Sequence, residues 1–212
     1  MMYSILREST YWLFRSIVSL FCTPTDVRGL EKLTQLTGPL IVAANHDGRL
    51  DPVWISVFIR HANPRYPVDI RFFAWHTFYD MPILGWYIKA MRSYRLINNQ
   101  GLQVLDPGVD FIKDKAGIIG IFPEGKIRRL TEKDKQAKRG VAYLAWKTEA
   151  PVLPIYIKYT RRWKRLPFYR LTFVVGDQFY IHDIIQTEDD LFEAASQVLS
   201  HSYSLAPIKH ET

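Results

Sequence analysis

The sequence predicts an α/β fold with a mainly parallel mixed sheet flanked by helices, preceded by an N-terminal amphipathic helix. Short apolar segments that suit buried strands alternate with longer segments of helical periodicity along the 212 residues. Proline, glycine and capping residues separate these segments, and no internal repeat or low-complexity tract interrupts them. Such alternation of strands and helices is typical of a mainly parallel sheet.

Strands are predicted where apolar and β-branched residues run together between turn-forming residues. These segments are 39–44, 69–74, 94–97, 117–122, 152–158 and 171–175. Helices are predicted between and after them, at 51–60, 82–91, 106–115, 138–148 and from Thr187 onward. Asp106 before Pro107, and Thr187 three residues before Asp190, are patterns that favour helix starts.

Residues 3–22 predict a helix with one apolar face, which Pro24 ends. At helical spacing, an arc of about 160° holds Leu13, Phe14, Ile17, Val18, Leu20 and Phe21. Arg15 interrupts the apolar run, which stays short of the roughly 18 residues of a spanning helix. We therefore divide the chain into a membrane-associating helix, residues 1–25, and a single domain, residues 26–212. The helix either lies in the membrane interface or packs on the domain.

The charge and cysteine content restrict the classes of partner and site. The formal net charge of +7 indicates an anionic partner, either nucleic acid, a phospholipid surface or a phosphorylated substrate. Cys22 is the single cysteine, so the chain forms no internal disulfide and no cysteine-rich metal site. Its expected place on the N-terminal helix makes it a poor candidate nucleophile.

The stretch IVAANHDGRLDP, residues 41–52, reads as a buried strand that ends at a histidine. With His46 in the following loop and Asp51 at the start of a helix, the chain can fold back and bring the two side chains together. A carboxylate on one imidazole nitrogen leaves the other nitrogen basic, as in a catalytic pair. Two alternatives remain: Asp51 as an ordinary helix cap, and a metal site made of His46, Asp47 and Asp51.

A second buried strand ends in the same manner. The stretch GIIGIFPEGKIRR, residues 117–129, passes from apolar residues to Pro-Glu-Gly and then to three cations. Ligands of α/β proteins bind at the carboxyl ends of such strands, and Lys126, Arg128 and Arg129 suit a phosphate there. The alternative is that these cations are ordinary solvated surface.

The order of these motifs resembles the glycerolipid acyltransferase family, the 1-acylglycerol-3-phosphate acyltransferases. Asn45-His46-x4-Asp51 is followed about 70 residues later by Phe122-Pro123-Glu124-Gly125, as in that family. KRGVAYLA at 138–145, APVLPIYI at 150–157 and the lead-in VRGLEKL at 27–33 continue the resemblance, which covers residues 27–180. The combination is far more specific than any one motif.

Three segments depart from the family pattern. Gly48 stands where the family often has serine, and Lys126-Ile127 stands where it usually has Thr-Arg. The second motif, Gly-x-x-Phe-x-x-Arg in the family, is KAMRSYR here, which leaves Arg95 as the matching arginine. These departures concern the phosphate contact and the identity of the acceptor.

The resemblance implies direct transfer of a fatty acyl group from a thioester to a lysophospholipid hydroxyl, here 1-acylglycerol-3-phosphate to give phosphatidic acid. It implies that His46 is the base and that Asp51 holds its tautomer. The residues expected to bind substrate are Asn45, Arg95, Glu124, Gly125, Lys126 and Arg128, with Glu124 organising the basic pocket. We expect no metal and no cofactor, with acyl-CoA or acyl-carrier protein as the donor.

Both substrates have apolar tails, so we expect a peripheral or monotopic protein at the cytoplasmic face of an anionic membrane. The segment KYTRRWKR, 158–165, interleaves Tyr159 and Trp163 with cations, which suits anionic headgroups. FFAWHTFY, 72–79, reads either as core strand or as exposed apolar wall.

Three other functions stay open at this point. One is a same-family acyltransferase with another lysolipid or an aminoacyl lipid as acceptor, which acceptor competition would reveal. A nucleic-acid-binding protein would leave the His46–Asp51 pairing and the Pro-Glu-Gly motif unexplained, so no nucleic acid is expected. A metal-dependent hydrolase would lose activity with a chelator.

Overall fold

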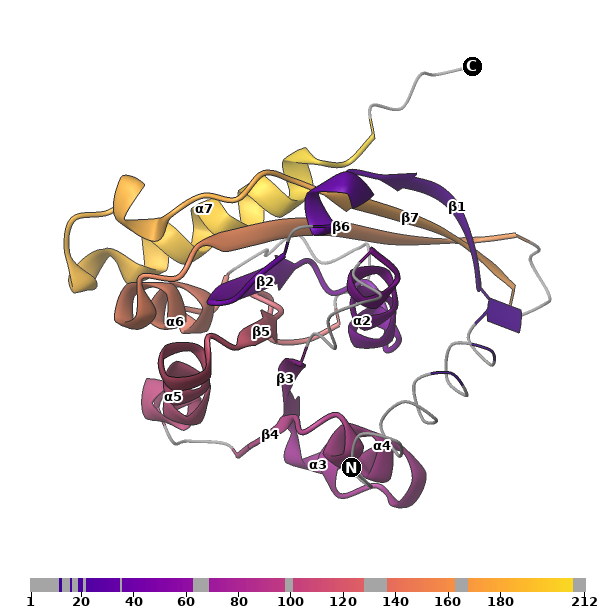
Figure 1. Cartoon of the computed structure of the whole chain (residues 1–212), viewed down its shortest axis with the longest axis horizontal. Coiled ribbons are helices and arrows are strands. Elements are labelled where there is room, and N and C mark those ends of the chain that lie inside the picture. The colour runs from indigo at the N-terminus through magenta and orange to yellow at the C-terminus, as the bar shows by residue number, and fades with distance from the viewer. Residues whose placement is uncertain are drawn as a thin grey trace.

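The computed structural model describes residues 12, 16, 19–20, 22–34, 36–62, 69–97, 101–127, 137–162 and 168–207. They build a seven-stranded sheet in the order β1-β7-β6-β2-β5-β3-β4 with helices on both faces (Figure 1). Neighbouring strands are parallel except for the antiparallel pair of β6 and β7. The predicted α/β class and mainly parallel mixed sheet are confirmed.

The strands lie close to their predicted positions, with one addition at the N-terminal side. They are β1 (Cys22–Arg28), β2 (Leu40–Ala44), β3 (Ile70–Trp75), β4 (Tyr94–Leu96), β5 (Ile118–Ile121), β6 (Val152–Arg161) and β7 (Tyr169–Val175). The helices are α2 (Asp51–Ala62), α3 (His76–Tyr79), α4 (Pro82–Ala90), α5 (Asp106–Lys115), α6 (Gly140–Thr148) and α7 (Leu191–Ser204). Short 3-10 turns lie at η1 (Leu30–Leu33), η2 (Leu102–Leu105), η3 (Ile181–Asp183) and η4 (Glu188–Asp190).

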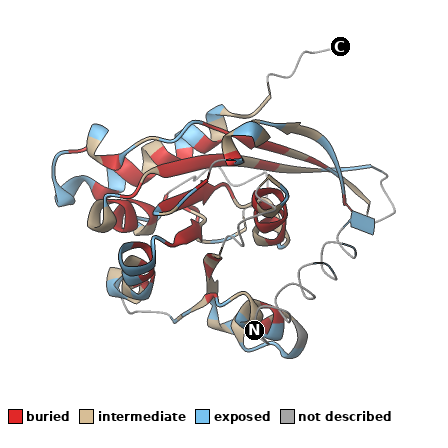
Figure 2. Ribbon diagram, viewed as in Figure 1, coloured by how far each residue is buried: buried red, intermediate tan, exposed pale blue. Residues whose placement is uncertain are grey.

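The central strand β2 divides the core into two layers. All five of its residues are buried, and alternate side chains point to opposite faces of the sheet. Leu40, Val42 and Ala44 join the cluster that packs against α2, whereas Ile41 and Ala43 join the cluster under α5, α6 and α7. Figure 2 shows that these strands and the inner faces of the helices are buried. A strand covered on both faces explains its continuous apolar sequence.

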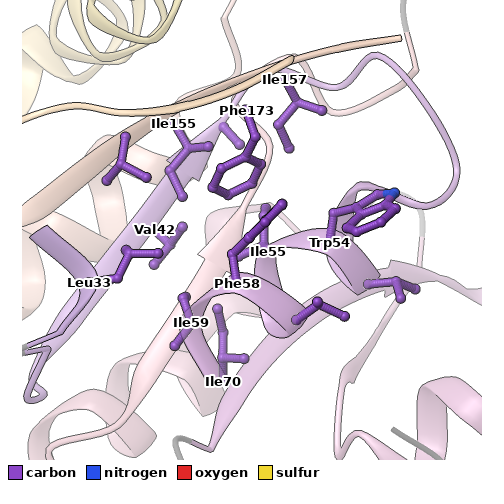
Figure 3. Packing of buried hydrophobic residues seen from close by; sticks show 14 of the residues in the cluster. Leu33, Val42, Trp54, Ile55, Phe58, Ile59, Ile70, Ile155, Ile157 and Phe173 are labelled. Atoms are coloured by element: carbon purple, nitrogen blue, oxygen red, sulfur yellow. The ribbon is translucent and has the colours of Figure 1, made fainter. Parts of the chain in front are cut away.

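The layer under α2 supports the segment that follows His46 in the chain. Figure 3 shows side chains of α2, including Ile55 and Phe58, pointing towards Phe173 and Ile155 of the sheet. The rings of Phe58 and Phe173 lie 4.3 Å apart between centroids. Each such fully buried side chain stabilises the fold by roughly 1.5 to 3 kcal/mol, so the packing of α2 holds Asp51 in place.

The prediction that Cys22 lies on the N-terminal helix is wrong. Cys22 is buried and begins β1, which runs parallel to β7 from Cys22 opposite Tyr169 to Arg28 opposite Val174. β1 therefore crosses the boundary predicted at residue 25. It was missed because it is an edge strand with little buried apolar surface, and its partner strand lies more than 140 residues further along the chain. Its proline is tolerated at a sheet edge.

Smaller differences concern helices. The four-residue helix α3 was not predicted, and α7 begins at Leu191 after the turn η4. The expected link at this helix start exists, since Thr187 Oγ1 donates to Asp190 Oδ2 at 2.9 Å. Most of the predicted N-terminal helix falls outside the described residues, which include only Trp12, Ser16, Ser19, Leu20 and Cys22 of it. Within the part that the structure describes, no helix has both the length and the apolarity to cross a bilayer.

Candidate active site

The loops that follow β2 and β5 meet at one edge of the sheet. The two strands are parallel neighbours, with Ala43 opposite Ile121, so their carboxyl ends lie side by side. This arrangement brings His46, from the first loop, against Phe122, from the second. The two rings stack with centroids 4.1 Å apart and planes 14° apart. Phe122 therefore fixes the plane of the imidazole, a role that the sequence did not reveal.

His46 and Asp51 form the pair expected from their spacing. The Nδ1 atom of His46 lies 2.7 Å from Oδ2 of Asp51, and the backbone N–H of Gly48 donates to the same oxygen at 2.9 Å. Because a carboxylate only accepts hydrogen bonds, Nδ1 carries the proton and Nε2 holds the basic lone pair. Asp51 is fully buried, whereas the His46 side chain keeps 17% exposure, so the base is reachable and its partner is shielded.

Burial and nearby hydrogen-bond donors act in opposite directions on the pKa of Asp51. Burial raises the pKa of this carboxyl, and the contacts with His46, the Gly48 N–H and the Tyr159 hydroxyl act in the opposite direction. A buried carboxylate is costly unless donors surround it. The loop around residue 48 thus supplies the donors that make an ionised Asp51 possible beside the imidazole.

Tyr159 closes the far side of this pair, although its sequence context suggested a headgroup-binding surface. Its ring is packed on the α2 layer, and its hydroxyl is buried beside the carboxyl group of Asp51. Burial and the neighbouring Asp51 raise the pKa of Tyr159, so it stays a protonated donor. Burial also raises the pKa of Cys22 to about 12, and this thiol close to Asp51 is therefore unreactive.

Asp47 links the loop after β2 to strand β6. One oxygen accepts the backbone N–H of Tyr159 at 2.7 Å and the other lies 3.2 Å from Lys158 Nζ. Its carboxylate is therefore turned to β6 rather than to His46. Among the described residues, no group of three or more His, Cys, Asp or Glu side chains is arranged to hold a metal ion, and the alternative set of His46, Asp47 and Asp51 is not formed.

Two of the residues expected to bind substrate make hydrogen bonds that position the loop. Asn45 is buried, and its amide exchanges hydrogen bonds of 2.7 and 2.8 Å with the backbone of Ile157. Glu124 is buried too, and its Oε1 accepts from the Tyr203 hydroxyl at 2.6 Å and from the His46 backbone N–H at 3.4 Å. Glu124 thus couples the Pro-Glu-Gly turn and α7 to the His46 loop.

An apolar cavity of about 340 Å³ lies next to His46. Its walls come from β3, α3, α4 and the first turns of α2, with side chains such as Phe72, Leu84, Tyr87 and Met91. The segment 72–79 therefore serves as both core and wall, since Phe72 is buried in the core and also lines the cavity. The pair of titratable groups at the end of an apolar cavity has the form of a small-molecule site.

The turn after β5 borders the same cavity. Gly125 has φ +67°, a left-handed conformation that glycine adopts without strain, and its carbonyl accepts from Trp75 Nε1 at 3.2 Å. Lys126 is exposed and lines the cavity. Arg49, which the sequence did not single out, lines it too.

The predicted phosphate ligands are only partly brought together. Arg95 lies at β4, where its guanidinium binds Asp80 at 2.6 Å, and it does not line the cavity. This ion pair lowers the pKa of Asp80 and raises that of Arg95. Arg128 falls outside the described residues, as does Trp163. Arg49 and Lys126 are thus the cations of the described chain that border the cavity.

The comparison with known families decides the assignment. A family model described as Acyltransferase matches residues 24–158, which is more than half of the chain. The chain belongs to the Acyltransferase family. A search of curated proteins gives no significant match for this acyltransferase.

Among solved structures, this acyltransferase is similar to the crystal structure of the 1-acyl-sn-glycerophosphate (LPA) acyltransferase PlsC from Thermotoga maritima. The TM-score is 0.70, and the similarity covers 99% of this chain and 83% of PlsC. The identity is 18%, so the match establishes a shared fold. It agrees with the α/β architecture described above.

Proposed function

We propose that this protein transfers a fatty acyl group from a thioester to the free hydroxyl of a lysophospholipid. The observation that carries the proposal is the His46–Asp51 pair at the end of an apolar cavity, with Nδ1 and Oδ2 at 2.7 Å. An acyltransferase needs a base for the hydroxyl and a dry space for the acyl chain, and both are adjacent here. Membership of the Acyltransferase family supports the same reaction class.

In the proposed step, Nε2 of His46 removes the proton from the acceptor hydroxyl as its oxygen attacks the thioester carbonyl. The new C–O bond forms, the C–S bond breaks, and the departing thiolate takes up the proton from the imidazolium. Asp51 stabilises the imidazolium and keeps Nδ1 protonated. Phe122 holds the plane of the ring, and no acyl-enzyme intermediate is needed.

We further propose 1-acylglycerol-3-phosphate as acceptor and acyl-CoA or acyl-carrier protein as donor. Arg49 and Lys126 at the cavity are suited to the acceptor phosphate, because cations form charge-assisted hydrogen bonds with its oxygens. The fold shared with an LPA acyltransferase favours this acceptor. Another lysophospholipid is the second candidate, since Arg95 is occupied by Asp80 and the expected three-cation phosphate site is incomplete among the described residues.

The test is a transfer assay with labelled acyl-CoA and a panel of lysolipids, with the products identified by mass. We expect phosphatidic acid as the main product and a loss of roughly 10³-fold or more for His46→Ala. His61→Ala, which changes a histidine at the far end of α2, is the matched control and should keep wild-type turnover. If His46→Ala retained a tenth of wild-type turnover, the assignment of the base would be wrong.

A further inference from the structure

One stretch of the chain supplies half of the exposed large apolar side chains of the described residues. Of eight such side chains, four come from the stretch 75–97, namely Trp75, Met81, Trp86 and Ile97. This stretch builds the end of β3, the helices α3 and α4, and strand β4. Figure 1 shows α3 and α4 together at the side of the molecule away from α7. The elements that supply the cavity wall thus also carry several exposed apolar side chains.

Helix α4 is apolar on two faces. Leu84, Tyr87 and Ile88 line the cavity, at the spacing of one helical face. Trp86 lies on another face with 47% of its surface exposed, and Met81 at the helix start is equally exposed. A surface helix with water on its outer side normally carries polar residues there. An outward tryptophan and methionine indicate a partner that accepts apolar groups.

The charges around this face are mostly positive. The stretch 75–97 holds Lys89, Arg92 and Arg95 against the single carboxylate of Asp80, which gives a formal charge of +2. Lys89 extends from α4 itself, with its Nζ 5.2 Å from the centroid of the Tyr79 ring. Lys126 adds a further cation at the cavity. Tryptophan next to cations suits the headgroup region of an anionic bilayer, where the indole is half-buried and the cations meet phosphate.

We propose that the outer face of α3 and α4, with Met81 and Trp86 at its centre, is the surface by which this protein docks on an anionic phospholipid bilayer. The inference rests on the proposed lysophospholipid transfer, since substrates with acyl chains reside in a bilayer. Because α4 also forms the cavity wall, docking by its outer face holds the cavity next to the lipid. This surface is distinct from the N-terminal helix and the segment 158–165 to which the sequence assigned docking.

The experiment compares two matched double variants of the full chain. Met81→Ser/Trp86→Ser removes the proposed docking side chains, neither of which lines the cavity. Tyr180→Ser/Phe192→Ser removes two side chains of similar exposure, 50% and 46%, that lie elsewhere on the molecule. Binding is measured by sedimentation with vesicles of phosphatidylcholine and phosphatidylglycerol in equal parts, and with phosphatidylcholine vesicles.

We expect the first variant to bind the anionic vesicles about tenfold more weakly than wild type or worse, because two large apolar groups no longer enter the lipid. The control should stay within about twofold of wild type, as surface substitutions usually do. Binding of wild type should be weaker to phosphatidylcholine alone. Brominated lipids should quench the fluorescence of wild type more strongly than that of Trp86→Phe.

Wild-type binding by the Met81→Ser/Trp86→Ser variant would overturn the proposal, and so would an equal loss in the control. Transfer to a short-chain, water-soluble lysolipid separates this result from the proposed function. The variant should retain that activity within about twofold, whereas a matching loss would show that Met81 and Trp86 support the fold or the site instead of docking. Absence of soluble transfer in wild type would contradict the proposed reaction and leave the vesicle result valid.

Discussion

The ring of Tyr159 occupies the space that a side chain at position 48 would need. A Cβ atom on Gly48 would lie 2.7 Å from Cε2 of the Tyr159 ring, well inside van der Waals contact. The same glycine donates its N–H to Asp51, and the hydroxyl of the same tyrosine lies beside this carboxyl and lowers its pKa. Gly48 and Tyr159 therefore form one packed support for the carboxylate that orients His46.

Gly48→Ala is expected to displace the Tyr159 ring and with it the support of Asp51. Overpacking of this kind costs about 1 to 3 kcal/mol in stability, and turnover should fall about tenfold because a misplaced catalytic pair is inefficient. Gly176→Ala does not serve as a control, because a Cβ atom on Gly176 would also clash with neighbouring side chains.

The control is a double-mutant cycle that combines Gly48→Ala with Tyr159→Val. Stability is measured by urea unfolding and activity by kcat.

Removal of the ring should relieve the clash, so Gly48→Ala should cost less in the Tyr159→Val background than in wild type. The interaction energy between two residues in contact is about 0.5 to 3 kcal/mol. Strictly additive effects would mean that Gly48 and Tyr159 do not act as one unit.

Tyr159→Phe tests the hydroxyl without disturbing the ring. The hydroxyl lowers the pKa of Asp51 as a donor, whereas burial raises it, so its loss should raise that pKa further. Asp51 must be ionised to support an imidazolium, and the acid limb of the kcat/KM profile should therefore move to higher pH. We expect kcat/KM to be severalfold lower than in wild type at pH values within the acid limb, and near the wild-type value at higher pH.

Tyr169→Phe is the matched control for that change. Its ring meets Tyr159 edge-on, at 6.2 Å between centroids, but its hydroxyl is not directed at Asp51. The control should leave the pH profile of kcat/KM unchanged. A Tyr159→Phe profile that coincides with wild type would show that the hydroxyl does not act on Asp51.

The residue pairs of the site that were predicted and those that were missed differ in the sequence separation between the two partners. His46 and Asp51 are five residues apart, and a strand end followed by a helix start is enough to bring them together. Glu124 and the His46 backbone, or Tyr159 and Asp51, meet only because β5 and β6 flank β2 in the sheet. No local pattern encodes that order.

The side-chain contacts of two further residues show the same limit. Arg95 has the spacing of a phosphate ligand, but Asp80 from the turn after α3 binds it away from the cavity. Tyr159 lies among cations in the sequence, yet alternation along β6 turns its ring into the core. Spacing and composition predict which residues occur near a site, whereas the side-chain direction depends on sheet register.

Asp51→Asn should separate stability from activity. Burial raises the pKa of Asp51 above its unfolded value, so the folded state holds this proton more tightly. Asp51 therefore contributes most to stability at low pH, and its contribution falls as pH rises from the unfolded pKa through the folded pKa. Asn keeps the shape and does not ionise, so the variant should be at least as stable as wild type at neutral pH.

The measurement is the unfolding free energy of both proteins across the acid range, together with turnover. Wild-type stability relative to Asp51→Asn should decline with rising pH, while transfer by the variant should be lower by roughly 10²-fold or more. A variant that became relatively less stable as pH rises would contradict the sign of the shift.

The phosphate contact can be tested by comparing two arginines. Arg49→Ala should raise the KM for a phosphate-bearing acceptor about tenfold, because a charge-assisted contact at the cavity is lost. Arg95→Ala should change that KM by less than about threefold, since its guanidinium is engaged with Asp80 at the surface. Donor KM should change little in either variant. A larger acceptor effect for Arg95 than for Arg49 would instead support Arg95 as the phosphate ligand, as the motif spacing predicts.

The depth of the cavity should set the accepted acyl chain length. Ser56 lines it from α2, about 7.5 Å further along the helix axis than Asp51. Ser56→Leu should block the far part and shift the preferred acyl-CoA to shorter chains, while Met91→Ala should open it and shift the preference the other way. The two variants control for each other, because a general loss of stability cannot move the preference in opposite directions.

The measurement is kcat/KM over a series of saturated acyl-CoAs of increasing length. Each methylene that leaves an apolar wall loses about 0.8 kcal/mol, which is close to a fourfold change per carbon and easily resolved. Ser202→Ala changes a buried serine of α7 whose hydroxyl donates to the Ala43 carbonyl at 3.2 Å, and it controls for loss of a buried hydroxyl. If Ser56→Leu lowered kcat/KM equally for every chain length, the acyl chain would not occupy the part of this cavity beside Ser56.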